Sequence, residues 1–298
     1  MTNEGGANSL QRAYFVWASA LAAAIGALLL FSAEPTVRQG LMETAGSFLT
    51  PKVMAIILAA LVCEYIDSTL GMGYGTTLTP ILMLVGYEPL KIVPAVLLSE
   101  LLTGLTSGAL HHAVGNVDLG RKSRHRRVAL VLGGCSVVGA AAAAVLAITI
   151  AKWVLSLYIG LLVLGIGVTI LATMNRSFAF SWAKITGLGL VAAFNKGMSG
   201  GGYGPLVMGG QLLSGLDPRS AIGITSVAEG LTCLVGVVLY MATTGIDSHL
   251  ALPLVLGAMF SVPLSVHSVR ALSARRLRLA VGLLTIALGA ATLVKLVW

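Results

Sequence analysis

The sequence predicts an all-α integral membrane protein built from two inverted repeats, each with a re-entrant hairpin and three transmembrane helices. Three observations lead to this fold class. Of the 298 residues, 57% are hydrophobic and only 10% are charged, whereas soluble domains average about 25% charged residues. The charges leave apolar stretches of about 20 residues or more, which is the length that a membrane-spanning helix needs. Two of the longer stretches are interrupted by similar glycine clusters.

These stretches define the elements in order. Residues 12–33 predict an additional N-terminal transmembrane helix, which with its linker fills 1–45. The first repeat, 46–175, contains a re-entrant hairpin (52–86) and helices over 90–113, 127–150 and 152–173. The second repeat, 176–298, contains a hairpin (181–213) and helices over 219–244, 249–271 and 276–297. The chain would then cross the membrane fully seven times.

Two Gly-Tyr-Gly triplets indicate the duplication. Superimposing the triplet that ends at Gly75 on the one that ends at Gly204 sets an offset of 129 residues. At this offset polar residues meet without a gap: Glu88 with Asp217, Glu100 with Glu229, Thr103 with Thr232 and Asp118 with Asp247. Matches of rare polar residues at one register indicate an internal repeat.

Lysine and arginine positions favour inverted repeats. If each broken segment crossed the membrane once, the bases would divide eight against ten, with no bias. If each segment enters and returns, thirteen lie on the side of the N-terminus and five on the other, with Lys196 inside the membrane. Because positive loops stay in the cytoplasm, we predict a multi-pass protein of the inner (cytoplasmic) membrane. Its N-terminus would be cytoplasmic and its C-terminus outside.

The glycine-broken segments are the predicted binding site. Unwound backbone at membrane depth needs protein or a wet cavity to satisfy it, and paired broken helices mark the substrate site of a transporter. A half-helix starts after each break, so its free N–H groups would suit an anion. The predicted backbone ligands are Gly73, Tyr74, Gly75, Thr76, Gly202, Tyr203 and Gly204. Tight packing through small residues is the alternative explanation.

Five charged residues lie inside the apolar segments, where charge is costly and commonly functional. We assign Lys196 to the substrate site, and we assign four acids to proton coupling or gating: Glu64, Asp67, Glu100 and Glu229.

A purely structural role is the alternative for these charges. In that case Asp67 would pair with the aligned Lys196, and the two matched glutamates would bond to Thr103 and Thr232. His111 and His112 precede a basic loop and are interpreted as interfacial side chains.

Other classes of function lack support in the sequence. It contains no nucleophile–base constellation, nucleotide loop or metal motif, and its loops are too short for a soluble domain. We therefore predict no enzyme, no cofactor and no metal site. The net charge of +8 comes from short loops without an aromatic-basic platform, which argues against a nucleic-acid partner. The expected partners are the lipid bilayer, a small anion and the proton.

The pattern resembles the sulfite exporter TauE/SafE family of membrane permeases. The resemblance covers about residues 50–297 and rests on the duplicated segments Gly71–Pro80 and Gly200–Gly204, with the acidic-proline turn that follows each. It implies a secondary transporter, an exporter of sulfite, an organosulfonate or a related small anion by alternating access. A cation or metal-ion transporter that uses the intramembrane carboxylates is the alternative. Neutralising Lys196 should abolish transport only in the first case.

Overall fold

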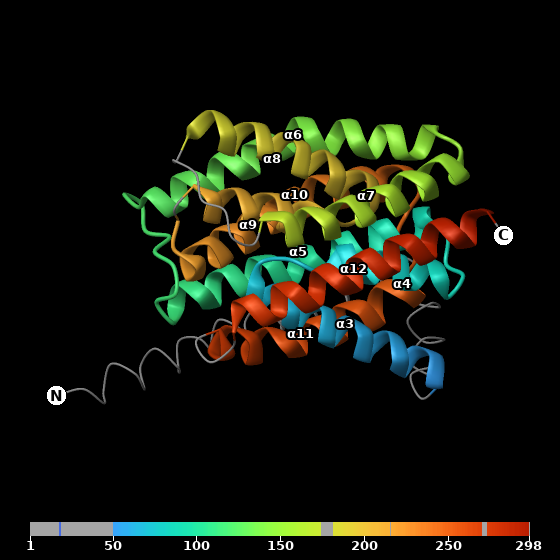
Figure 1. Cartoon of the computed structure of the whole chain (residues 1–298), viewed down its shortest axis with the longest axis horizontal. Helices are drawn as coiled ribbons and strands as arrows, with labels where there is room; N and C mark the ends of the chain where they lie inside the picture. The colour runs from blue at the N-terminus through green and yellow to red at the C-terminus, as the bar shows by residue number, and fades with distance from the viewer. Residues whose placement is uncertain (1–17, 19–49, 174–180, 215, 270–272, 298) are drawn as a thin grey trace.

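The computed structural model describes residues 50–173, 181–214, 216–269 and 273–297, together with Ala18. Within these residues all regular secondary structure is helical (Figure 1). In chain order the helices are α3 (Pro51–Leu70), α4 (Tyr74–Leu84), α5 (Pro89–Ala113), α6 (Arg124–Thr149), α7 (Lys152–Thr173), α8 (Trp182–Ser199), α9 (Tyr203–Leu213), α10 (Pro218–Thr243), α11 (Ser248–Ser268) and α12 (Ala274–Val297). Except for Ala18, the N-terminal helix predicted over 12–33 lies outside the described residues.

Seven of the described helices are long and apolar enough to span a membrane. Six of them, α5, α6, α7, α10, α11 and α12, are the full crossings that the sequence predicted within the two repeats. The seventh is α3, the first arm of the first broken segment. Its 20 residues measure about 30 Å at 1.5 Å per residue. The length of α3 would therefore suit a full crossing as well as one arm of a hairpin.

Proline and acidic residues begin the matched helices α5 and α10. Pro89 and Pro218 take the first helical position, where a missing N–H leaves no bond unmade. Asp217 caps α10 by accepting hydrogen bonds from two backbone N–H groups of the first turn, at 3.1 and 3.2 Å. Glu88, at the same position, makes no cap bond and pairs with Lys152 at 2.7 Å. The hydrogen bond from Lys152 lowers the pKa of Glu88.

Helix packing repeats between the two halves of the chain. α6 packs on α8 as α11 packs on α3, and α6 packs on α10 as α11 packs on α5. The matched pairs α5 with α10 and α7 with α12 also lie side by side. Each first arm of a broken segment thus packs mainly against a helix of the other half, so neither half completes its core alone.

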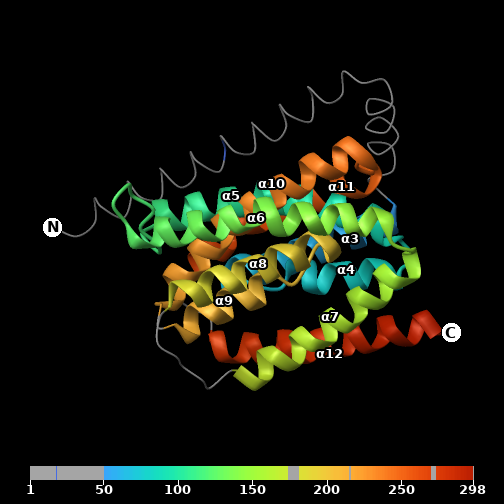
Figure 2. The ribbon, with the colours of Figure 1, turned by 90° about the horizontal axis from the view of Figure 1, so that it is seen from above.

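The two broken segments occupy opposite ends of the molecule. In Figures 1 and 2, α4 lies toward the end that carries the C-terminus, whereas α9 lies toward the other end. Their breaks meet in the middle, where the charged residues of both halves also lie.

Both breaks have a positive φ at the same two positions, and glycine occupies each of them. Gly71 (φ +70°) and Gly200 (φ +71°) end the first arms in the left-handed region. Gly73 (φ +134°) and Gly202 (φ +82°) then precede the second arms. Other residues rarely adopt such values, so these glycines fix where each helix stops and restarts.

The two breaks cross with their backbones in direct contact. A Cβ added at Gly75 would overlap the carbonyl oxygen of Gly200, and a Cβ at Gly204 would lie 2.5 Å from Gly71 O. A Cβ at Gly201 would lie 2.7 Å from the Gly75 carbonyl carbon. Close packing, the alternative explanation for the glycine clusters, is therefore a real role of these residues. It does not exclude a binding role next to the crossing.

Candidate functional site

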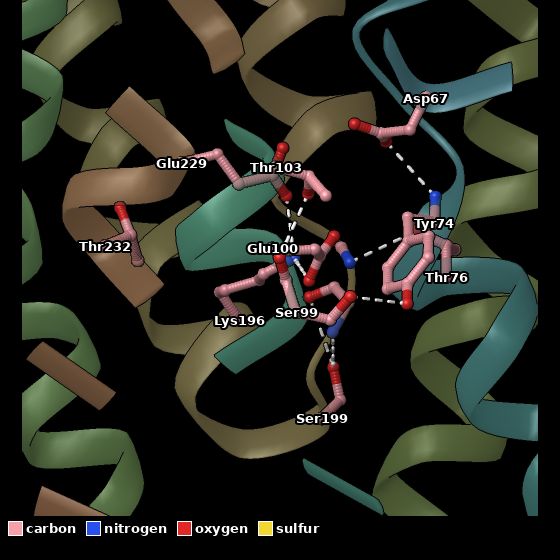
Figure 3. A network of polar contacts seen from close by, with 12 residues as sticks. Asp67, Tyr74, Thr76, Ser99, Glu100, Thr103, Lys196, Ser199, Glu229 and Thr232 are labelled. Carbon is pink, nitrogen blue, oxygen red and sulfur yellow. Dashed lines mark hydrogen bonds and ion pairs between the residues drawn. The ribbon is translucent and has the colours of Figure 1, made fainter. Parts of the chain in front are cut away.

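Lys196 lies at the centre of a buried charged cluster. It belongs to the last turn of α8, and its side chain is 1% exposed. Its ammonium group forms ion pairs with Glu229 Oε1 on α10, at 2.7 Å, and with Glu100 Oε2 on α5 (Figure 3). The two glutamates matched by the duplication therefore converge on the one lysine of this cluster.

Asp67 completes a group of three carboxylates. One oxygen from each of Asp67, Glu100 and Glu229 lies within 4.8 Å of the others. Asp67 itself makes no ion pair with Lys196, so that structural alternative is wrong: its Oδ1 accepts a hydrogen bond from the backbone N–H of Tyr74 at 3.1 Å. Asp67 therefore caps the N-terminus of α4, a position that favours an acidic side chain.

Glu64 lies one turn before Asp67 on α3 and is held by two hydroxyl groups. Ser68 Oγ donates to Glu64 Oε1 at 2.6 Å, and Thr103 Oγ1 donates to Glu64 Oε2 at 3.1 Å. The predicted threonine bonds to the matched glutamates are not formed. Thr103 serves Glu64, and the hydroxyl of Thr232 bonds to Ser136 Oγ at 2.5 Å.

The cluster combines four carboxylates with one ammonium group, all almost completely buried. A surplus of buried negative charge is very costly unless counter-charges or protons compensate it. One carboxylate oxygen, Glu100 Oε1, is buried without a hydrogen-bond partner. Four ionised carboxylates beside one ammonium group would leave such a surplus.

The predicted backbone ligands surround the crossing, but some of their N–H groups already donate hydrogen bonds within the protein. The N–H of Tyr74 is taken by Asp67, and the N–H of Gly202 donates to Thr76 Oγ1 at 3.2 Å. In the second half the position of Asp67 is occupied by Lys196, which points to the glutamates. The N-terminus of α9 therefore lacks the carboxylate that caps α4, and the two half-helices differ in this respect.

The tyrosines of the two triplets are buried core residues. Tyr74 and Tyr203 are both 0% exposed and pack in separate hydrophobic clusters. The hydroxyl of Tyr74 lies 2.9 Å from Ser99 Oγ (Figure 3). In this conformation neither ring faces an open space, so only their backbone groups remain predicted ligands.

Sequence reasoning missed the role of His111. It was interpreted as interfacial, but the residue is 0% exposed and its Nε2 lies 3.0 Å from Ser68 O. Its neighbour His112 is exposed, as expected. The available signal was the duplication itself, because His111 aligns with Tyr240, another buried polar ring.

Apolar helices of membrane-spanning length around a closed, charged cluster define a multi-pass membrane transport protein. The chain belongs to the sulfite exporter TauE/SafE family, whose sequence profile matches residues 56–292. It is 28% identical over 258 residues to the "Probable membrane transporter protein YtnM" of Bacillus subtilis (strain 168), an alignment that covers 82% of this chain and 83% of that protein. No solved structure matches the chain at a significant level. The predicted family membership is thereby confirmed.

Proposed function

We propose that this protein is a secondary transporter that exports a small anion such as sulfite or an organosulfonate, together with protons. Membership of the TauE/SafE family supports the class of substrate. The observation that carries the proposal is the buried ion-paired Lys196 beside the crossing of the two glycine breaks. A buried lysine in a membrane protein provides a counter-charge for an anion at a depth where water does not.

The open half-helix of the second repeat is the proposed substrate site. The carboxylate of Asp67 already caps the N-terminus of α4. At the N-terminus of α9 no such cap is present, because the aligned residue is Lys196. The ammonium group and the backbone N–H groups of Tyr203 and Gly204 would bind the anion together. The first half-helix, with its backbone ligands Gly73, Gly75 and Thr76, would complete the site from the other side.

Anion binding and proton binding are coupled in this scheme. An anion that reaches Lys196 would meet Glu100 and Glu229, which already contact the ammonium group. Two ionised carboxylates would repel it, because charges at such distances interact strongly at low dielectric. Binding therefore requires that the glutamates take up protons, so the anion and the protons are bound to the protein at the same time.

The conformational change would be alternating access between inverted repeats. We propose that each broken segment is a re-entrant hairpin and that the two hairpins open the cluster to opposite sides in turn. The placement of α4 and α9 at opposite ends of the molecule supports this (Figure 1), as does the matched packing of α8 on α6 and α3 on α11. In this scheme the described conformation, with its buried cluster, would be the occluded state.

A cation transporter is the second candidate function. The observation that favours it is the group of three carboxylates whose oxygens lie within 4.8 Å of one another. Carboxylate oxygens are the ligands that hard divalent cations prefer. The ion pairs of Lys196 oppose it, since the ammonium group already pairs with two of these three carboxylates, Glu100 and Glu229.

Reconstituted protein distinguishes the two functions. Proteoliposomes loaded with sulfite, isethionate or sulfate and assayed for counterflow are expected to exchange at least one of these anions. Uptake of Mg²⁺, Mn²⁺ or Zn²⁺ should not exceed that of empty liposomes. Movement of a metal ion without any anion would contradict the main proposal.

The inverted topology has a separate test. Accessibility tags inserted at residue 123 and at residue 246 should report opposite sides of the membrane, the first cytoplasmic. These positions correspond nearly to each other in the two halves. If both tags reported the same side, the repeats would be parallel and the hairpin proposal would be wrong.

A further inference from the structure

A file of buried polar side chains leads from the α5–α6 loop to the charged cluster. We propose that protons reach the cluster from this side through His111 and Glu64, which Asn116 and Ser68 hold in place, so that proton uptake is confined to one face of the protein. This inference rests on the proposed proton-coupled transport and assigns its route.

The contacts of the file run from the loop to α3 and are interrupted once, at the backbone carbonyl of Ser68. Asn116, which follows the exposed Gly115, is 5% exposed, and its Nδ2 lies 3.0 Å from His111 Nδ1. His111 Nε2 lies 3.0 Å from Ser68 O, and Ser68 Oγ donates to Glu64 Oε1 at 2.6 Å. The amide oxygen of Asn116, at the loop end of the file, is buried without a hydrogen-bond partner.

The partners of His111 determine its tautomer. A carbonyl oxygen only accepts hydrogen bonds, so Nε2 must carry the hydrogen that bonds to Ser68 O. Asn116 Nδ2 also donates to Val266 O at 3.3 Å, which identifies it as the amide nitrogen and leaves Nδ1 of His111 as an acceptor. The neutral ring therefore presents a proton acceptor toward the loop and a proton donor toward α3. Once Asn116 releases Nδ1, a proton from water can bind there, and the Nε2 proton can pass to the Glu64 carboxylate. The ring is then neutral in its other tautomer, and Glu64 is a neutral carboxyl group.

The Ser68 carbonyl closes the file in this conformation. A carbonyl group has no proton to pass on, so Nε2 must leave it before it can reach Glu64. Ser68 lies three residues before the break at Gly71, within the last turn of α3. Movement of the first broken segment would therefore open the route, which ties proton transfer to the transport cycle.

The second half of the chain provides an internal comparison. At the offset of 129 residues, Tyr240 replaces His111, and its hydroxyl donates to Gly197 O at 2.9 Å, the counterpart of Ser68 O. Ala193 replaces Glu64, and Gly245 replaces Asn116. A tyrosine is thus sufficient to bond this carbonyl. The histidine and the glutamate at these positions of the first half are not needed for that bond, which favours a role in proton transfer in the first half alone.

Other charged and titratable groups surround the file. Asp67 lies one turn from Glu64 on α3, and Thr103 on α5 connects Glu64 to the helix that carries Glu100. His267, in the last turn of α11, interacts electrostatically with His111. These groups make the central carboxylates the natural destination of a proton that leaves Glu64.

The test separates anion exchange from proton movement in proteoliposomes. Counterflow of the transported anion needs no net proton transfer, whereas transport driven by a pH gradient does, and a trapped pH-sensitive dye records it. In Glu64→Gln and His111→Gln, gradient-driven transport and dye response should fall by about a hundredfold or more, the lower end for loss of a positioned proton-transfer group, with counterflow within about twofold. Tyr240→Phe, the matched control, should retain both.

Melting temperatures in detergent and counterflow show whether a variant is folded, and Ser68→Ala serves as a milder change to the same file. The proposal is overturned if either Glu64→Gln or His111→Gln is folded and retains the wild-type proton flux. It is also overturned if Tyr240→Phe loses as much proton flux as these two variants. Wild-type anion exchange without proton movement would also overturn it while leaving anion transport intact. Wild-type protein that exchanges no anion would instead contradict the proposed function.

Discussion

Replacing Lys196 with methionine is expected to abolish anion transport and to lower the free energy of unfolding by about 3–5 kcal/mol, the cost of breaking a buried ion pair by removing one partner. The ammonium group of Lys196 is shared by Glu100 and Glu229. Methionine has a similar length, so it would leave both carboxylates buried without their counter-charge. Anion counterflow and denaturation in detergent measure the two effects.

A triple variant separates stability from transport. Lys196→Met combined with Glu100→Gln and Glu229→Gln removes the unbalanced charge as well as the lysine, and neutral replacements of buried ion pairs are often tolerated. We expect this variant to regain stability but not anion transport. Anion transport by Lys196→Met alone would place the substrate site elsewhere. Metal-ion transport by that variant would favour the cation alternative.

Gly75→Ala is expected to prevent the two broken segments from crossing. Its Cβ would overlap the carbonyl oxygen of Gly200, and a backbone oxygen at a helix end cannot rotate away as a side chain can. We expect a loss of about 3 kcal/mol, the upper end of the usual cost of overpacking, and loss of transport. Thermal melting and size-exclusion chromatography of the purified protein check this.

Gly209→Ala is the matched control for the crossing. Gly209 lies within α9, and an added Cβ would meet no atom within 4 Å. Alanine is also the better helix former, by about 1 kcal/mol per residue, so this variant should be as stable as the wild type or more stable. If Gly75→Ala had the same melting temperature as Gly209→Ala and transported normally, the breaks would not cross as closely as described.

Local patterns in the sequence predicted the elements of this fold well. The two interrupted stretches, 52–86 and 181–213, became α3 with α4 and α8 with α9, because glycines with positive φ determine where a helix stops. The six helices that follow begin and end within three residues of their predicted bounds. Hydrophobic length and helix-starting prolines are properties of a short stretch of chain, so they require no knowledge of the neighbours.

The sequence by itself also indicated which charged residues lie inside apolar segments and which of them align at the offset of 129 residues, because a repeat preserves register. Only the tertiary structure decided their partners. Alignment equated Asp67 with Lys196, yet Lys196 binds the two glutamates and Asp67 caps α4. Equivalent positions are related by the duplication, whereas contacts depend on how helices from both halves cross. That crossing brought the two breaks into contact, and the packing of α5 on α3 brought His111 to Ser68. In both cases the residues are far apart in sequence, so no local pattern predicts the contact.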